Sequence, residues 1–390
     1  MLTNLDRRSI LAGSLAMGAT SIAAPRMAFA RTAGSQNMLL VVLRGAADGM
    51  AMLAPVGDPD FERIRGGALG DYEGARKASG FFAIHPALDQ IGKAYAEGDA
   101  LFVHAAATAY RERSHFDGQN LLETGGTAPY SQRDGWLNRL VGVLGANASG
   151  AHPKALAIAP TMPLALRGSA PASSYAPSAL PDASDDFLER VSRLYASDEQ
   201  LGNLWMRALE TQEMAGNDGL RNLRDAKAAG ELAASLMREE DGARIAMVEL
   251  GGWDTHANQR GAFNRQAGQM DALLGAYRTA MGSAWQNTLV LVATEFGRTV
   301  RYNGTNGTDH GTASAAIVMG GAVRGGQVIA DWPGMGAGDL FEGRDLKPTV
   351  ALESVLAGAA ADHFGLDAKE LMAALFPGRP GLPLGGLTRA

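Results

Sequence analysis

Short apolar runs alternate with helical patterns along most of the chain. The runs occupy positions 38–43, 101–105, 155–159, 164–167, 244–250, 288–293, 315–319 and 327–330. They are rich in Val, Leu, Ile and Ala and are too short for surface helices, so they predict strands covered on both faces. Helical patterns occupy 86–97, 134–144, 258–281, 348–364 and 368–375. The alternation predicts an α/β fold with a doubly wound, mostly parallel sheet flanked by helices.

One long stretch departs from this alternation. Positions 171–179 are rich in Ser, Ala and Pro, and positions 185–238 then follow a helical pattern with few β-branched residues. We interpret about 181–240 as a helical insertion that caps the sheet. The remainder of 31–390 is long enough to bury one large core, so we expect one α/β domain with this insertion.

The first thirty residues have the pattern of an export signal rather than of a folded element. Arg7 and Arg8 precede a mildly apolar stretch at 10–24, and Ala28 and Ala30 supply the small residues that a signal peptidase reads. Adjacent arginines before a Gly- and Ala-rich stretch resemble a twin-arginine signal. An ordinary secretory signal or a membrane anchor is the alternative, but the apolar run is shorter than a span requires. We therefore expect export by the twin-arginine machinery to the periplasm or the medium.

Charge and cysteine content narrow the possible ligands. The formal net charge of the whole chain is −6, and residues 1–30 carry three arginines and one aspartate, so the remaining chain has a net charge of −8. An acidic chain has no electrostatic reason to bind nucleic acid or anionic lipid. Because the chain has no cysteine, any metal must be held by oxygen and imidazole ligands.

The stretch 288–311 concentrates chemically active side chains. Its apolar run predicts a buried strand that ends on Glu295, and a Gly- and Asn-rich loop follows. Arg298 precedes that loop, and Asp309 and His310 end it. Open α/β sheets bind ligands at the carboxyl ends of their strands, so these four residues are candidates for a site.

Other predicted strand ends also carry polar groups. Asp48 follows the first strand, Ser114 and His115 begin a helix after the second, and Asp254 and His256 follow the strand at 244–250. The carboxyl ends of parallel strands share one edge of a sheet, so residues far apart in sequence can converge there. Carboxylates with imidazoles suit zinc, manganese or calcium. We expect a divalent metal site at this edge.

Several phrases identify a resemblance to known proteins. They are LRGAADGM, HPAL, RSHFDGQNLLETG, GWLNR, GGWDTHANQ, ATEFGRTVRYNGTNGTDHG, MGGAVRGGQV and DWPG, and they span nearly the whole chain after residue 30. The chain is identified by them as a member of the exported bacterial family called domain of unknown function 1501. That family resembles the alkaline phosphatase and sulfatase superfamily, so the resemblance implies an alkaline phosphatase-like fold.

The resemblance also implies site roles. Enzymes of that superfamily hydrolyse phosphate or sulfate esters with two metals and a nucleophile at a helix start. Asp48 matches the acid after the first strand, and Ser114 matches the position of the nucleophile. Asp254 with His256 resembles a metal pair, the phrase ATEFG stands where the superfamily has an Asp–His pair, and TDHG resembles the late histidine ligand.

Three features depart from the superfamily pattern. Glu295 replaces the expected aspartate, Phe296 stands where the second metal's histidine should be, and the spacing from Asp254 to His256 is shorter than usual. Because phenylalanine cannot bind a metal, the second metal site is damaged or rebuilt. A single metal held by Asp254, His256 and His310 is consistent with this pattern, and so is a chain that only keeps the fold.

Some roles stay open at this level. Ser114 is either a nucleophile or a helix cap. His115 is either reactive or a hydrogen-bond donor to a carboxylate. Arg298 either clamps an anionic substrate or holds its loop. The leading hypothesis is an exported metal-dependent hydrolase of anionic phosphate or sulfate esters, with Asp48, Asp254, His256, Glu295, Asp309 and His310 around metal and with Ser114, His115 and Arg298 as catalytic residues. The alternative is a non-catalytic binding or assembly protein of the cell envelope.

Overall fold

The computed structural model describes residues 36–147, 153–177, 183, 185–195, 198–215, 223–379 and 381–389. The export signal predicted at 1–30 lies outside these residues. A central sheet has the strand order β11-β5-β10-β9-β1-β8-β6-β7, with β12 paired to β5. All of its pairings are parallel except those of β10 with β5 and β9. The mostly parallel sheet predicted from the apolar runs is therefore confirmed.

Seven of the nine described strands of this sheet overlap the predicted apolar runs. The bounds of the strands are β1 (Asn37–Leu43), β5 (Ala100–Ala107), β6 (Ala155–Ile158), β7 (Ser173–Tyr175), β8 (Ile245–Leu250), β9 (Thr288–Thr294), β10 (Ser314–Met319), β11 (Val328–Ile329) and β12 (Val350–Ala351). The exceptions to the overlap are β7, which lies in the Ser-, Ala- and Pro-rich stretch 171–179, and β12, which takes the start of the helix predicted at 348–364. Every residue of β1 and β9 is buried. Successive side chains of β1 enter opposite cores: Leu39, Val41 and Leu43 belong to one core, and Met38, Leu40 and Val42 to the other.

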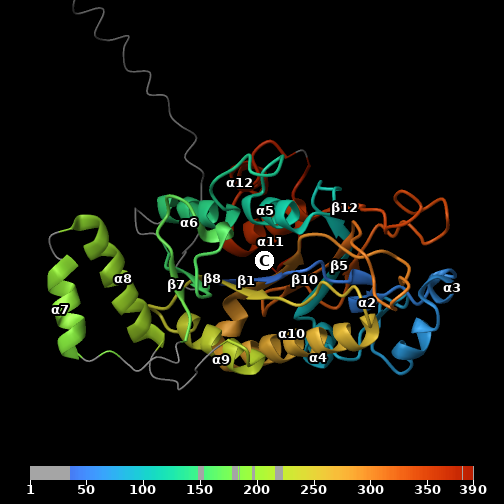
Figure 1. Ribbon diagram of the computed structural model, residues 1–390, viewed down its shortest axis with the longest axis horizontal. Coiled ribbons are helices and arrows are strands. Elements are labelled where there is room, and N and C mark those ends of the chain that lie inside the picture. Colours follow the sequence, from blue (N-terminus) through green and yellow to red (C-terminus); the bar gives the residue numbers. More distant parts are fainter. Residues whose placement is uncertain are drawn as a thin grey trace, which may run out of the picture. The chain divides into compact units, whose positions relative to one another are not determined.

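Helices cover both faces of the sheet, as Figure 1 shows. On one face lie α4 (Asp89–Glu97), α9 (Ala226–Met237) and α10 (Gln259–Met281), and their apolar side chains form the first core. On the other face lie α6 (Trp136–Asn147), α11 (Leu352–Phe364) and α12 (Ala368–Leu375), which form the second. The helix α5 (His115–Thr124) lies on this second side, above the carboxyl ends of the strands. The doubly wound arrangement is confirmed.

Two local predictions are wrong. The run 164–167 is a 3₁₀ turn, η2 (Leu164–Leu166), rather than a strand, because Pro163 begins it and the Leu166 amide bonds back to the Pro163 carbonyl. The helix predicted from position 86 begins three residues later, at Asp89, because a turn closed by the Leu88 amide and the His85 carbonyl precedes it.

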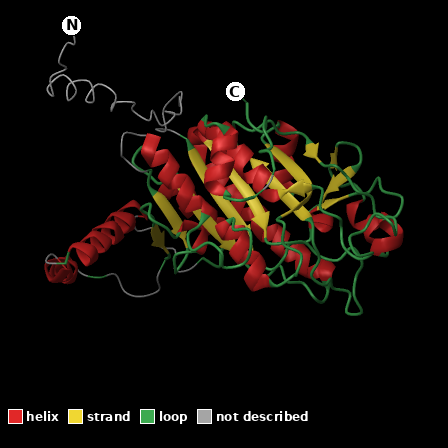
Figure 2. Ribbon diagram, turned by 90° about the horizontal axis from the view of Figure 1, so that it is seen from above, coloured by secondary structure: helices red, strands yellow, loops and turns green. Residues whose placement is uncertain are grey.

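Two stretches of the chain carry further elements. The stretch 56–80 carries α3 (Phe61–Arg65), η1 (Ala68–Tyr72) and β3 (Lys77–Ala78), and β3 joins β2 (Leu53–Ala54) and β4 (Phe82–Ile84) in a small sheet. The stretch expected as a helical insertion contains α7 (Asp185–Tyr195), α8 (Glu199–Ala215) and α9. Figure 2 shows α7 and α8 beside the sheet rather than over it. The helix α9 instead packs along α10 within the layer that covers the sheet.

Among the described residues, no helix combines the length and the apolar content needed to cross a bilayer.

Candidate metal centre

Loops from three neighbouring parts of the sheet meet at the carboxyl ends of its strands. The loop after β8 carries Asp254 and His256, the end of β9 is followed directly by Glu295, and the segment after β5 leads into α5 at His115. His310 arrives from the Gly- and Asn-rich loop, which pairs back on the chain after β9 through the bridge between Arg298 and His310. The convergence expected from a parallel sheet therefore occurs for these residues.

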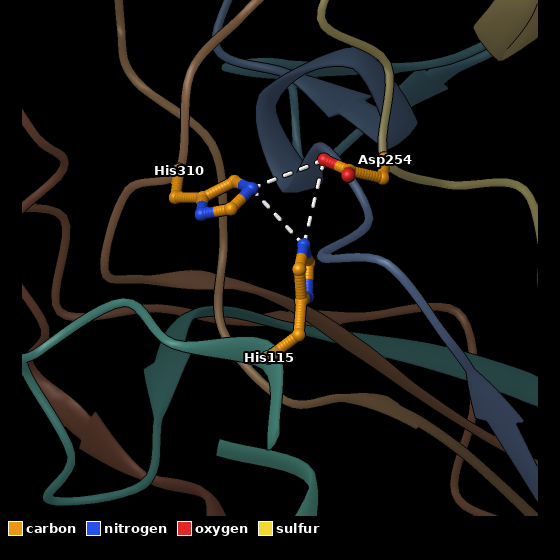
Figure 3. A group of neighbouring side chains, drawn as sticks. All are labelled: His115, Asp254 and His310. Carbon is orange, nitrogen blue, oxygen red and sulfur yellow. Dashed lines mark hydrogen bonds and ion pairs between the residues drawn. The ribbon is translucent and has the colours of Figure 1, made fainter. Parts of the chain in front are cut away.

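Three of these side chains form a compact group, shown in Figure 3: His115, Asp254 and His310. The Nε2 atoms of His115 and His310 are 3.0 Å apart, and Asp254 Oδ1 lies 3.4 Å from the first and 3.1 Å from the second. His256 adjoins the group, because its Nε2 lies 2.9 Å from Asp254 Oδ1 and 3.0 Å from His310 Nε2. Ligands of a tetrahedral zinc ion are roughly 3.3 Å from one another, so these separations fit one small cation.

The second nitrogen of each ring fixes its tautomer. His115 Nδ1 is 2.8 Å from Glu295 Oε1, and His310 Nδ1 is 2.9 Å from the Arg113 carbonyl oxygen. His256 Nδ1 is 3.3 Å from Asp309 Oδ1. A carbonyl or an ionised carboxylate only accepts hydrogen bonds, so each Nδ1 must carry the proton. In the neutral ring the lone pair is then on Nε2, the atom that faces the group.

In the neutral rings the Nε2 lone pairs therefore face one another and the Asp254 carboxylate oxygen. The three Nε2 atoms are then acceptors, as is Asp254 Oδ1. The Nε2 atoms of His115 and His256 each lie 3.0 Å from His310 Nε2, and Asp254 Oδ1 lies within 3.4 Å of all three. Such an arrangement is repulsive unless a proton or a metal ion is shared among them. Metal-bound histidines usually donate their other ring N–H to a carboxylate or a carbonyl, as all three do here. The donor set of His115, Asp254 and His310 thus fits a divalent transition metal, and His256 lies beside it as a further donor.

Electrostatics keep Asp254 ionised. Burial raises the pKa of Asp254, but the hydrogen bond and the charge of Arg298 outweigh it, with help from His256 and His115, and lower the pKa to about 2. Arg298 Nη1 lies 2.7 Å from Asp254 Oδ1, and its Nε donates to the Thr308 hydroxyl. The Arg298 side chain is fully buried, so its contact with Asp254 holds the carboxylate in place rather than reaching for solvent.

The imidazoles of the group titrate in opposite directions. The hydrogen bond to Glu295 raises the pKa of His115, although burial opposes it. Burial lowers the pKa of His310, and the charge of His115 lowers it further. One protonated ring beside one neutral ring is the pattern expected when two imidazoles share a small site. Glu295 stays ionised beside His115, because its hydrogen bonds lower its pKa against the effect of burial.

A Glu295→Gln variant is expected to lower the pKa of His115. The amide keeps the size of the buried side chain but removes the negative charge that stabilises the imidazolium. The raised pKa contributes stability below the unfolded value of about 6.5 and loses it as pH rises through the folded value, so the variant should be most destabilised relative to the parent at low pH. NMR titration of the histidine rings in chelator-treated protein measures the pKa.

The matched control is Glu249→Gln. Glu249 is a partly exposed carboxylate that pairs with Arg44 rather than with a histidine. It should leave the His115 titration unchanged. An unchanged His115 pKa in Glu295→Gln would contradict the role assigned to the buried carboxylate.

Asp48 is placed differently from the sequence-based expectation. Its carboxylate forms a buried ion pair with Arg65, with Nη1 to Oδ2 at 2.7 Å, and it accepts from Gln259 Nε2 at 2.8 Å. The amides of Met50 and Ala51 also donate to it. With both oxygens occupied, this geometry does not support Asp48 as a metal ligand. Glu295 and Asp309 are also not among the converging atoms. Glu295 contacts Nδ1 of His115 and Asp309 contacts Nδ1 of His256, so each carboxylate supports a ring rather than facing the metal position.

Ser114 and Phe296 border the group. Ser114 is the N-cap residue of α5 but makes no side-chain cap hydrogen bond, and its amide donates to the Tyr110 hydroxyl. Phe296 is buried, with its ring stacked 5.1 Å from the His115 ring and tilted at 5.5 Å from the His310 ring. The aromatic ring therefore forms a wall of the site.

Two glycines allow the loops to approach each other. Gly45 has φ +113, its amide donates to Glu295, and a Cβ there would lie 2.5 Å from the Asp254 amide nitrogen. At Gly307 a Cβ would lie 2.0 Å from the carbonyl carbon of His256. Any side chain at these positions would push the loop of Asp254 and His256 away from Glu295 and His310.

The role of His115 is one of those that the sequence left open. The structure shows that it does donate to a carboxylate, and that its other nitrogen faces Asp254 and His310. The sequence did mark His115 as a candidate, because it is the first helical residue after a predicted strand end. Ser114 was singled out for the same kind of position. Arg298 likewise holds its loop, but its partner is Asp254 rather than an anionic substrate.

The sequence of the chain matches one known protein family. A sequence profile described as "Protein of unknown function (DUF1501)" matches residues 103–376, which is more than half of the chain. No curated protein matches the sequence.

Several solved structures are similar at low identity. A phosphonate monoester hydrolase of Agrobacterium radiobacter is 14% identical, with 88% of this chain and 78% of that chain covered and a TM-score of 0.30. The PsFucS1 sulfatase from Pseudoalteromonas is 12% identical, with 75% and 64% covered and a TM-score of 0.36. A putative sulfatase from Bacteroides thetaiotaomicron is 10% identical, with 90% and 76% covered and a TM-score of 0.34. Likenesses this distant carry no argument about activity, which must come from the site itself.

Proposed function

The chain belongs to the family described as protein of unknown function (DUF1501), and on that premise we propose that it is an exported, metal-dependent hydrolase of phosphate or sulfate esters. The observation that carries the proposal is the convergence of the Nε2 atoms of His115 and His310 with Oδ1 of the ionised Asp254 carboxylate, since these three atoms lie 3.0 to 3.4 Å apart. The Nδ1 atom of each of these histidines, and of the adjacent His256, contacts a carboxylate or a carbonyl oxygen, which fixes the orientation of the ring. Metal-bound histidines usually make this second contact.

The proposed ligands are His115, Asp254 and His310, and His256 lies beside them. Zinc fits this histidine-rich set best, manganese is second, and calcium, which prefers oxygen ligands, fits least well. A divalent ion held there would polarise an ester oxygen and lower the pKa of a bound water.

The chain itself supplies the remaining functions. Arg298 and Asp309 orient Asp254 and His256, so the ligand atoms stay fixed while a substrate binds. Ser114 is the proposed nucleophile, because it directly precedes His115 and its hydroxyl does not cap α5. The hydroxyl would lose its proton and bond to the phosphorus or sulfur atom, while the ester O–P or O–S bond breaks and the leaving alkoxide takes up a proton to depart as the alcohol. Water would then cleave the Ser114 ester, releasing phosphate or sulfate and restoring the hydroxyl. The anionic substrate would meet the amino end of α5, which favours negative charge.

Export completes the proposal. The arginine pair and the small residues at 28 and 30 support a twin-arginine signal and a periplasmic or secreted location. That pathway carries folded proteins, so the metal could be bound before the chain leaves the cytoplasm.

One observation favours a second candidate, a non-catalytic envelope protein. Phe296 occupies the position of a histidine in the superfamily pattern and packs against both His115 and His310. Among the described residues one group of side chains can hold a metal ion, not two. A binding protein with a single structural metal is consistent with those facts, and it differs from the hydrolase in that Ser114→Ala should leave its phenotype intact.

Metal content and ester hydrolysis test the proposal together. Protein purified after export is expected to carry close to one zinc or manganese ion per chain by elemental analysis. It should hydrolyse aryl phosphate, phosphonate or sulfate esters, and Ser114→Ala should lose that activity but keep the metal. A metal content below about one ion per ten chains, without hydrolysis when zinc, manganese or calcium is added, would refute the hydrolase. Metal without hydrolysis would favour the envelope protein.

A further inference from the structure

A buried carboxylate lies one contact beyond the groups that support His310. The side chain of Asp345 is fully buried and pairs with two arginines: its Oδ2 accepts from Arg113 Nε and its Oδ1 from Arg344 Nε, each at 2.8 Å. Both arginines contact His310 in turn. The Arg113 carbonyl oxygen lies 2.9 Å from His310 Nδ1, and Arg344 Nη2 donates to the His310 carbonyl oxygen. The ring and the backbone of His310 are thus each held by a residue that Asp345 holds.

Asp345 also connects two ligand-bearing segments of the chain. The turn 341–345 is closed at its base by two backbone hydrogen bonds. Through Asp345 it pairs with Thr299, on the chain that leads from β9 to the Gly- and Asn-rich loop. Arg113 lies on the other segment, two residues before His115, the first residue of α5. One carboxylate therefore joins two segments that each carry a proposed metal ligand.

The backbone of Arg113 has a conformation that needs external support. Its φ is +61, in the left-handed region that residues other than glycine rarely adopt. Such conformations persist where the surroundings hold them, and they cluster at functional sites. The Arg113 side chain is held by ion pairs with Asp345 and Glu342, and its guanidinium lies over the Phe341 ring, 5.9 Å from the ring centroid. The carbonyl oxygen that accepts from His310 therefore belongs to a residue whose conformation depends on these contacts.

We propose that Asp345 is a positioning residue of the metal centre, which keeps His310 Nε2 directed at Asp254 by holding Arg113 and Arg344. It acts through the two arginines rather than by contact with a metal or a substrate. Each carboxylate oxygen accepts from one arginine, so the amide of an Asp345→Asn variant, which has a single acceptor oxygen, can serve only one of them. The inference rests on the metal centre of the proposed function but not on ester hydrolysis.

Zinc affinity, measured by competition with a chromophoric chelator, tests the proposal. Asp345→Asn should weaken zinc binding by about tenfold, the lower end of the range for outer partners of metal ligands, because the effect passes through the arginines. The absorption spectrum of the cobalt-loaded protein should also change, because it depends on how the ligands surround the ion. Arg344→Met breaks one of the two connections and should weaken zinc binding less. The Arg344 side chain is 47% exposed, so this variant keeps the test available if the buried substitution prevents folding.

Asp99→Asn is the matched control. The Asp99 side chain is 14% exposed and also pairs with two arginines, Arg278 and Arg389, but it precedes β5, whereas the segment of Arg113 follows that strand. This variant should lower the free energy of unfolding and leave the zinc affinity and the cobalt spectrum as in the parent. A loss of stability without a metal effect is what a purely structural Asp345 would also give.

A metal-free measurement completes the test. In chelator-treated protein labelled with ¹⁵N-histidine, the Nδ1–H proton of His310 is assigned by its loss in His310→Gln. It should exchange with water faster in Asp345→Asn than in the parent, because the Arg113 carbonyl is held less firmly.

The outcomes separate this inference from the hydrolase proposal. Unchanged zinc affinity and proton exchange in Asp345→Asn, or an equal loss of zinc affinity in Asp99→Asn, would overturn the positioning role and leave the hydrolase standing. The expected changes in a protein that binds zinc but hydrolyses no ester would refute the hydrolase and support the positioning role. A parent protein that binds neither zinc nor cobalt would overturn both.

Discussion

A His310→Gln variant is expected to lose its metal and, with it, ester hydrolysis. His310 Nε2 is the central atom of the group, at 3.0 Å from the Nε2 atoms of His115 and His256 and 3.1 Å from Asp254 Oδ1. Loss of an outer partner of a ligand typically costs 10- to 100-fold in metal affinity or activity, so loss of the ligand itself should cost more than about a hundredfold.

The substitution separates metal binding from folding. A glutamine amide can still donate to the Arg113 carbonyl oxygen, which His310 Nδ1 reaches at 2.9 Å, so the loop should keep its position. The removed element is the imidazole lone pair that faces Asp254. Metal content by elemental analysis and kcat/KM on aryl esters should fall together, while the circular dichroism spectrum of the chelator-treated variant matches that of the chelator-treated parent.

His363→Gln is the matched control. His363 is also a buried histidine whose ring bonds a backbone carbonyl oxygen, that of Asn37, but it lies on α11 and has no place in the metal group. Its loss should lower stability and leave metal content and kcat/KM intact. If His310→Gln keeps the full metal content, the assignment of the centre fails even where the protein is inactive.

The framework of the site could be predicted because burial on both faces leaves a strong pattern. The chain segments of β1 and β9 are apolar except at their ends, and those ends fall within one residue of the predicted bounds. The site-bearing loops follow from those ends: Asp254, His256, Glu295 and His310 lie at one sheet edge as the parallel arrangement requires. The run at 164–167 failed because apolar content alone does not distinguish a strand from a turn that Pro163 initiates.

The partners of each candidate could not be predicted, because they depend on side-chain direction and on distant segments. Nothing in the sequence near Asp48 shows that Arg65, seventeen residues later, donates to its carboxylate and neutralises it. The sequence likewise left open whether His115 is reactive or bonds a carboxylate, and the answer required knowing that Glu295 lies behind it and Asp254 in front of it. The sequence therefore identifies the acidic residues at the strand ends. It does not distinguish those that face the metal position from those that hold a ligand in place.

Asp48→Asn is expected to destabilise the fold strongly while leaving the metal ligands in place. The Asp48 and Arg65 side chains are 0% and 2% exposed, and burial by itself lowers the pKa of Arg65, while the carboxylate reverses this and raises the pKa above its ordinary value. Removal of one partner from a buried ion pair leaves an uncompensated charge and typically costs 3–5 kcal/mol. Urea unfolding of chelator-treated protein, monitored by circular dichroism, measures this free energy.

A surface pair of the same chemistry provides the control. Arg63 and Asp60 are bonded at 2.6 Å on the neighbouring turn, with side chains 56% and 29% exposed. Asp60→Asn should cost less than about 1 kcal/mol, because solvent screens the charge that remains. Equal effects of Asp60→Asn and Asp48→Asn would show that burial does not govern the Asp48 pair.

A double replacement distinguishes a stabilising ion pair from one that is merely costly to break. Asp48→Leu with Arg65→Met removes both charges and fills a similar volume, so it should recover much of the stability lost in Asp48→Asn. Gln259 would then lose its acceptor on Asp48 but keep its contacts with Thr255 and Thr308, the latter of which also accepts from Arg298. If the double variant regains stability and still binds metal, Asp48 supports the fold beneath the site. If it regains stability but loses the metal, the pair positions Asp254 through Gln259, Thr308 and Arg298.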